Sequence, residues 1–318
     1  MKQFTFADVF AGIGGFRRAF ENLGGTCLLS VEKDKWCKQT QRANFTDHLE
    51  HVWCDDITQL AHDFDYPPLD LFCAGFPCQP FSQAGRKKGL KDPRGNLMFD
   101  MLRLIEYCAP RVILLENVPR LRSIDDGRVF NALCRALADL KYSVFHRVVC
   151  SSSWIPQKRK RIFIVGIKGE LSPLFDPLDQ IAFPQKPKPK LGDILENQVD
   201  PKYTLSANGW KAMQAHKKRH REQGHGFGQK LFGSNDVAST LVSGKSRMSI
   251  LIRQKGKCPR KLTPTECARL MGFEPWKINV SDHQAYCQFG NSVVVPLVQA
   301  IGTALLPYFQ PKTGDVCN

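Results

Sequence analysis

The sequence predicts an α/β protein with a mostly parallel sheet and helices on both of its faces. In the first half of the chain, short β-rich runs alternate with segments whose apolar residues recur at helical spacing. This rhythm stops after Lys168, where prolines cluster. We expect strands at residues 4–10, 27–32, 69–74, 112–116, 142–150 and 161–167, and helices at residues 15–23, 35–44, 97–108 and 129–140.

The change in composition after Lys168 predicts a second, smaller domain. Residues 190–257 are rich in Gly, Lys, Arg and His and predict an irregular domain of loops and short strands. Thr263 and Pro264 predict the start of a helix that continues to Met271. We therefore expect four segments, at residues 1–180, 185–257, 258–283 (a hinge) and 284–318 (a C-terminal helix that returns to the first domain).

The charge of the chain favours a polyanionic partner. Its 318 residues include 45 Lys and Arg against 30 Asp and Glu, which gives a formal net charge of +15. Nucleic acid fits this charge better than a membrane surface, because no amphipathic anchor helix is evident. The sequence also lacks an apolar run of about 18 residues and a signal-peptide pattern, so we expect a cytoplasmic protein.

A glycine-rich loop follows the first expected strand and opens the first expected helix. The loop runs from Phe10 to Phe16 and contains Gly12 and Gly14, so its backbone can approach a cofactor closely. Glu32 ends the second strand, where a carboxylate can accept hydrogen bonds from both ribose hydroxyls. This spacing fits an adenosylmethionine or a dinucleotide site, although Arg17 stands where a dinucleotide loop has its third glycine.

Cys78 lies in a proline-flanked turn directly after the third expected strand. Its position puts it at the same edge of the sheet as the glycine loop. A reactive cysteine needs electropositive surroundings, and the basic stretch from Arg86 and Lys87 to Arg94 supplies positive charge. We interpret Cys78 as a nucleophile rather than a packed thiol, and the stretch as a loop able to close over a phosphate backbone.

Glu116 ends the fourth expected strand at this same edge. It follows four apolar residues, so the carboxyl group should be partly desolvated. Such a group suits donation of a hydrogen bond or proton to a ring nitrogen, and the alternative is a strand-end residue that caps a helix.

Two arginines lie at the entry to the last expected strand. Because side chains alternate along a strand, Arg159 and Arg161 are expected on one face, where both can point at one anionic or carbonyl group. A solvated run of charges remains the alternative.

Taken together, these blocks resemble the cytosine-5 DNA methyltransferase family over nearly the whole chain. The resemblance rests on blocks in the family's order: Phe10-Ala11-Gly12-x-Gly14-Gly15, Pro77-Cys78-Gln79, Glu116-Asn117-Val118, Gln157-x-Arg159-x-Arg161, Arg260 to Phe273, and Gln288-Phe289-Gly290-Asn291-Ser292-Val293.

The resemblance implies a Rossmann-like S-adenosylmethionine-dependent methyltransferase sheet and a smaller target-recognition domain. Cys78 would attack cytosine carbon 6 while Glu116 holds ring nitrogen 3. Arg161, supported by Arg159, would face the carbonyl oxygen of the base. The implied S-adenosylmethionine contacts are Phe10, Gly12, Gly14, Glu32, Asp56 (with the adenine amino group), Ile57, Pro77, Leu97, Asn291 and Ser292.

One residue departs from the pattern of the family. Relatives often carry an apolar or aromatic group after the acidic residue, and this chain carries Lys33. The group that covers the adenine face is therefore left open.

The resemblance also implies duplex DNA as the substrate, with the target cytosine flipped out of the stack because carbon 6 is hidden there. The basic segment resembles the recognition domain of bacterial modification enzymes, which leaves a restriction endonuclease as a functional partner. The recognition sequence is not decodable, and monomeric action would suffice. The implied DNA contacts are Gln79, Ser82, Arg86, Lys87, Thr240 and Leu241.

Three other functions remain as alternatives. An RNA cytosine-5 methyltransferase would use the same fold and chemistry, and a catalytically silent DNA-binding protein would keep only the fold. A dinucleotide oxidoreductase leaves Cys78 and Glu116 unexplained. We expect no metal site, because His216, His220 and His225 lack a cysteine or carboxylate partner set.

Overall fold

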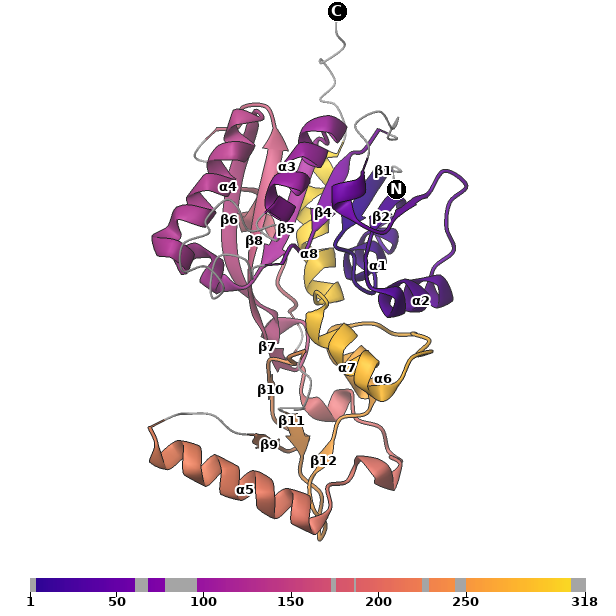
Figure 1. The fold of residues 1–318 in the computed structure, drawn as a ribbon, viewed down its shortest axis with the longest axis vertical. Helices are drawn as coiled ribbons and strands as arrows, with labels where there is room; N and C mark the ends of the chain where they lie inside the picture. Colours follow the sequence, from indigo (N-terminus) through magenta and orange to yellow (C-terminus); the bar gives the residue numbers. More distant parts are fainter. Residues whose placement is uncertain are drawn as a thin grey trace, which may run out of the picture. The chain divides into compact units, whose positions relative to one another are not determined.

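The structure is a computed structural model of the full chain (Figure 1). It describes residues 4–60, 68–77, 96–172, 176–185, 187–224, 229–243 and 250–309. The chain divides into two compact units. The first unit comprises residues 1–149, 160–183 and 295–318, and the second comprises residues 150–159 and 184–294.

A seven-stranded sheet with the order β3-β2-β1-β4-β5-β8-β6 forms the centre of the first unit. The pairs from β3 to β5 are parallel, whereas β8 runs antiparallel to β5. The direction of the chain along the sheet reverses between β1 and β4, which is where α/β proteins bind ligands at the carboxyl ends of strands. The strands are β1 (Phe4–Val9), β2 (Gly25–Val31), β3 (Val52–Cys54), β4 (Leu71–Ala74), β5 (Val112–Asn117), β6 (Tyr142–Cys150) and β8 (Lys160–Lys168).

Helices cover both faces of this sheet. The strand β1 has apolar side chains on each face, and both faces are therefore buried against other elements. Phe4 and Phe6 form an aromatic cluster with Phe20 of α1 and with Phe309. Ala7 and Val9 belong to the main hydrophobic core, which includes residues of α3 and α4. The fold-class prediction is therefore confirmed. The helices of this unit are α1 (Gly15–Glu21), α2 (Lys35–Asn44), α3 (Asn96–Cys108), α4 (Arg128–Asp139) and α8 (Val295–Leu305), which packs against α1.

The second unit consists of short strands and three helices in its described part. β9 (Lys230–Phe232), β11 (Ile250–Ile252) and β12 (Arg260–Lys261) form one small sheet, and β7 (Gln157–Lys158) pairs with β10 (Ala238–Ser239). The helices are α5 (Ala207–Glu222), α6 (Pro264–Met271) and α7 (Asp282–Asn291). Thr263 caps α6 as predicted, in a capping box with Glu266 whose carboxylate also pairs with buried Arg260.

Two features of the second unit differ from the expectations. The helix α5 has 16 residues, whereas loops and short strands were expected there. The helix was missed because its exposed, basic sequence lacks the apolar stripe that identifies a helix. Residues 258–294 belong to the same compact unit as residues 184–257, and the chain rejoins the first unit at Val295.

Among the described residues, one helical stretch, Asp282–Tyr308, is long and apolar enough to cross a membrane by length and composition alone. An 18-residue window of this stretch has a mean hydropathy of 1.6, and 61% of that window is buried within the protein, which is typical of a core helix.

Candidate active site

The glycine loop between β1 and α1 turns through three residues with left-handed backbone. The φ angles are 56° at Phe10, 55° at Gly12 and 80° at Gly14. Glycine adopts this region without penalty, whereas the Phe10 backbone is strained by about 1 kcal/mol or more. Tertiary contacts must therefore hold the loop in this shape.

Gly12 is held from both sides by side chains of the neighbouring elements. Its amide donates to Glu32 Oε2 at 2.7 Å, and its carbonyl accepts from Gln41 Nε2 at 2.8 Å. Glu32 also accepts from the Asp34 amide at 2.7 Å, and burial raises the pKa of its carboxyl group. Gln41 was not predicted, because a polar residue on a helix gives no sequence signal for such a contact.

The loop and Glu32 fit the ribose end of an adenosyl cofactor. A Cβ added at Gly12 would meet no atom within 4 Å, so the backbone borders open space. The backbone amides of Gly12, Asp34 and Lys33 hydrogen-bond the Glu32 carboxylate, which has about four lone-pair sites and so can still accept from a hydroxyl.

Lys33 and Asp56 form an ion pair beyond the ends of β2 and β3. Lys33 Nζ lies 2.7 Å from Asp56 Oδ2, and Asp56 Oδ1 accepts from the Thr58 amide and hydroxyl. The hydrogen bond from Lys33 is the main cause that lowers the pKa of Asp56. The Lys33 side chain is 82% exposed, so its stem is free to cover a ligand while its ammonium group stays on Asp56.

Two polar residues at the end of β5 reach the loop that follows β4. Asn117 Nδ2 donates to the Phe76 carbonyl at 3.0 Å. A Cβ on Gly75 would lie 3.8 Å from Glu116 Oε2, so this carboxylate lies beside the loop that leads to Cys78. Glu116 is buried, and its Oε1 lies 2.8 Å from Arg161 Nε of β8. Asn117 belongs to a recognised sequence block, but its contact was not predicted.

Several predicted site residues lie outside the described part of the chain. These are Cys78 and the predicted DNA contacts Gln79, Ser82, Arg86 and Lys87. Pro77 and Leu97, which border this segment, are exposed and half-buried.

Arg159 has different partners from Arg161. Its side chain is 2% exposed and donates to the carbonyl oxygens of Leu241 (2.9 Å), Gly290 (3.0 Å) and Ser292 (2.7 Å). The expectation that both arginines point at one group does not describe this arrangement. Arg159 stands between β7 and β8, so the alternation of a single strand does not extend from Arg159 to Arg161.

Replacing Arg159 by methionine should destabilise the protein by about 3 kcal/mol or more, because three carbonyls lose a charged donor. Urea unfolding would measure the loss. Arg269→Met is the matched control in the same unit: Arg269 pairs with exposed Glu274 at 3.0 Å, so its loss should cost about 1 kcal/mol or less. An Arg159→Met protein of unchanged stability that has lost its activity would instead favour a catalytic role.

The dipeptide Thr240-Leu241 is fixed to β7. The Leu241 amide donates to Gln157 Oε1 at 2.8 Å, and the Thr240 hydroxyl donates to the Lys158 carbonyl at 2.9 Å. Leu241 is 1% exposed, so in this structure its side chain belongs to the core of the second unit. Gln157 thus holds the backbone of Leu241, a contact that was not predicted from the sequence.

The remaining predicted cofactor residues lie in both units. Ile57 is buried in the first unit directly after Asp56, whereas Asn291 and Ser292 lie at the end of α7 in the second unit. Among the residues that the structure describes, no three His, Cys, Asp or Glu side chains form a metal-binding group.

A glycine loop held by a carboxylate, with polar residues at the ends of neighbouring parallel strands, defines an α/β protein with a nucleotide-type loop. The family model described as C-5 cytosine-specific DNA methylase matches residues 4–306. The chain belongs to this family of DNA (cytosine-5)-methyltransferases.

Named relatives agree with this membership. The chain is 44% identical over 317 residues to the type II methyltransferase M.DsaV of Dactylococcopsis salina, covering 96% of this chain and 87% of the relative. It is 44% identical over 307 residues to M.NlaX of Neisseria lactamica, covering 94% and 95%. The S. pombe Dnmt2 methyltransferase structure shares the fold, with a TM-score of 0.74 at 21% identity, over 96% of this chain and 99% of that one.

Proposed function

We propose that the protein transfers a methyl group from S-adenosylmethionine to carbon 5 of a cytosine in a specific duplex DNA sequence, through a covalent bond between Cys78 and carbon 6. The observation that carries this proposal is the meeting of Glu116, Arg161 and the loop before Cys78 at the end of β4 and β5. A cytosine ring next to that loop would have nitrogen 3 within reach of Glu116.

The residues have distinct roles in the proposed reaction. The Cys78 thiolate adds to carbon 6, and the Glu116 carboxyl group, protonated for this step, donates a hydrogen bond to nitrogen 3 that favours the addition, while its Oε1 stays beside Arg161. Carbon 5 thereby becomes nucleophilic and accepts the methyl group. Loss of the carbon-5 proton to a base and elimination of the Cys78 sulfur then restore the ring. Arg161 keeps the Glu116 carboxylate in place and faces the carbonyl oxygen.

The proposed cofactor contacts come from the glycine loop and from the residues that follow β2 and β3. Glu32 would accept from the ribose hydroxyls and Gly12 would give them room, while Asp56 would accept from the adenine amino group. S-adenosylmethionine supplies the electrophilic methyl group when bound. The contacts assigned to Phe10, Gly14, Ile57, Pro77, Leu97, Asn291 and Ser292 belong to the same proposal.

Helix α5 supports duplex DNA as the partner. No residue of α5 is fully buried, and Met213, His216 and His220 form its less exposed side. Lys211, Lys218 and Arg221 are exposed and follow one another at spacings of seven and three residues, which forms a cationic stripe that also contains Glu222, 3.9 Å from Lys218. We propose that this stripe contacts phosphates, which hold a duplex without reading its sequence.

Replacing Lys211, Lys218 and Arg221 together by glutamine should reduce the slope of log K against log salt concentration by about 2.7, or about 0.9 per lost contact. Fluorescence anisotropy with duplex DNA would measure the slope. The preference for the recognised sequence should be unchanged. A charge-matched control replaces Arg128, Arg135 and Lys141 of the first unit by glutamine. An equal reduction of the salt slope in both triple variants would attribute the effect to net charge.

The biological role is proposed from the relatives. Type II methyltransferases lead the curated matches, so we propose that the chain is a cytoplasmic modification enzyme that acts as a monomer beside a restriction endonuclease.

The substrate assay that tests the proposal uses tritiated S-adenosylmethionine with mixed-sequence duplex DNA and, separately, with RNA. Label recovered as 5-methylcytosine from DNA alone is the expected result. Label in RNA alone would select the RNA methyltransferase, and tight DNA binding without transfer would select the silent binding protein.

A further inference from the structure

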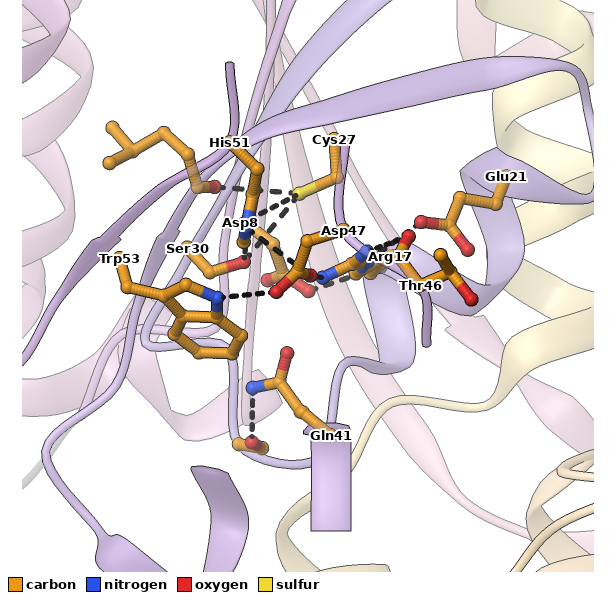
Figure 2. Close-up of polar contacts among 12 residues, drawn as sticks. Asp8, Arg17, Glu21, Cys27, Ser30, Gln41, Thr46, Asp47, His51 and Trp53 are labelled. Carbon is orange, nitrogen blue, oxygen red and sulfur yellow. Dashed lines mark hydrogen bonds and ion pairs between the residues drawn. The ribbon is translucent and has the colours of Figure 1, made fainter. Parts of the chain in front are cut away.

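Arg17 is buried on the inner side of α1, at the position where a dinucleotide-binding loop has a glycine. Its side chain is 1% exposed. The guanidinium group donates to Glu21 Oε1 (2.7 Å), Asp47 Oδ1 (2.7 Å) and the Thr46 carbonyl (3.1 Å), and it lies 4.5 Å from the Phe45 ring centroid. Figure 2 shows the Arg17 side chain between Glu21 and Asp47, next to Thr46. A buried arginine needs such partners, because an unpaired charge there is strongly destabilising.

The backbone of Arg17 closes the glycine loop. Its amide donates to Asp8 Oδ2 of β1 at 3.0 Å, so one hydrogen bond joins the two ends of the loop. Asp8 is fully buried, and burial raises its pKa to about 8. At neutral pH the carboxyl group is therefore mainly protonated, and it acts as a hydrogen-bonding link rather than as a second anion for Arg17.

The segment held by Arg17 contacts the loop directly. A Cβ on Gly14 would lie 2.6 Å from the Phe45 ring, so this ring packs closely on the loop backbone. One turn earlier on α2, Gln41 holds the Gly12 carbonyl. Arg17 thus contacts the three residues that follow α2, Phe45, Thr46 and Asp47. Phe45 and Gln41, at this end of α2, in turn contact the glycine loop.

Asp47 connects Arg17 to β2 and β3, the strands that precede Glu32 and Asp56. Its Oδ2 accepts from Trp53 Nε1 at 2.9 Å, and its Oδ1 lies 3.3 Å from His51 Nδ1. His51 Nε2 lies 3.0 Å from Ser30 Oγ of β2, two residues before Glu32. Burial and the nearby Arg17 charge lower the pKa of His51 to about 4, so the imidazole is neutral at pH 7.

We propose that Asp8, Arg17 and Asp47 form a brace, centred on the buried Arg17 side chain, that sets the conformation of the glycine loop, and that Arg17 is a positioning residue for the cofactor. The brace touches neither the cofactor nor the DNA in this proposal. It maintains the strained turn at Phe10 and the position of Gly12 against Glu32, and so it acts on cofactor affinity. The inference rests on the proposed cofactor site.

The test compares Arg17→Met, Arg17→Lys and Asp47→Asn with the wild type. Isothermal titration with S-adenosylhomocysteine should show at least about tenfold weaker binding for Arg17→Met, since about 1.4 kcal/mol corresponds to tenfold. KM for S-adenosylmethionine should rise in parallel, while kcat at saturating cofactor and the Kd for DNA change by less than about threefold. Arg17→Lys should restore part of the affinity, because the charge and one hydrogen bond remain.

Arg147→Met is the matched control. Arg147 in the same unit also binds two carboxylates and a backbone carbonyl, namely Asp176, Asp179 and Leu178, but these contacts lie away from the glycine loop. This variant should keep wild-type cofactor affinity. Thermal unfolding of each variant sets an assay temperature well below its midpoint. If Arg17→Met does not fold, Asp47→Asn carries the test, because Asp47 is partly exposed.

Three outcomes have defined meanings. Unchanged cofactor affinity in Arg17→Met and Asp47→Asn would overturn the brace. Parallel losses of kcat, DNA affinity and cofactor affinity would also overturn it, since they indicate general damage. Wild-type protein that binds no S-adenosylhomocysteine would instead contradict the proposed function.

Discussion

Replacing Cys78 by alanine is expected to reduce methyl transfer by about a thousandfold or more, because the nucleophile that activates carbon 5 is lost. The variant should still bind duplex DNA and S-adenosylhomocysteine, since the thiol makes no essential binding contact in the proposed reaction. Single-turnover transfer of tritiated methyl groups to duplex DNA measures the loss.

Cys73 provides the control for Cys78. It lies five residues earlier in β4, is fully buried, and burial raises its pKa well above the usual range, so it cannot serve as a thiolate at neutral pH. Cys73→Ala should retain transfer in the folded protein. Undiminished transfer by Cys78→Ala would contradict the proposed mechanism.

Covalent trapping tests the same step by a different readout. DNA that carries 5-fluorocytosine has no proton to lose from carbon 5 after methylation, so the bond between carbon 6 and the thiol should persist. Mass spectrometry of the digested complex should locate the nucleotide on the peptide that contains Cys78. A nucleotide on any other cysteine would reassign the nucleophile.

The second large effect is expected for Glu116→Gln. Glutamine keeps the shape of the side chain, but it cannot give a proton to ring nitrogen 3, and it puts a neutral amide in place of the carboxyl group whose Oε1 lies 2.8 Å from Arg161 Nε. We expect kcat to fall by about a hundredfold or more, which is the usual contribution of a positioned acid–base group. Cofactor affinity should change little, because Glu32 and Gly12 form a separate contact.

Steady-state and single-turnover kinetics on duplex DNA measure this effect. Glu170→Gln is the control, because Glu170 is an exposed carboxylate of the same unit and should leave kcat unchanged. A fall of less than about tenfold for Glu116→Gln would exclude an essential acid–base role.

The sequence by itself determined the fold class and indicated the edge of the sheet at which the proposed site lies. Parallel strands end at one edge, so the residues after β1, β2, β4 and β5 could be brought together from strand patterns alone. In the structure, Gly12 meets Glu32, and Glu116 lies beside Gly75, as this rule predicts. Strand periodicity is a local signal, and it carries enough information for this conclusion.

Only the tertiary structure decided the partners of the buried charged side chains. Arg159 and Arg161 are two residues apart in the sequence, yet one binds carbonyls 82 to 133 residues away and the other binds Glu116. Arg17 takes a glycine position of a related loop, and its ion pair with Asp47 requires the end of α2 to fold back on α1. The partners of a buried cation are set by the long-range packing that desolvates it, and local sequence spacing does not encode that packing.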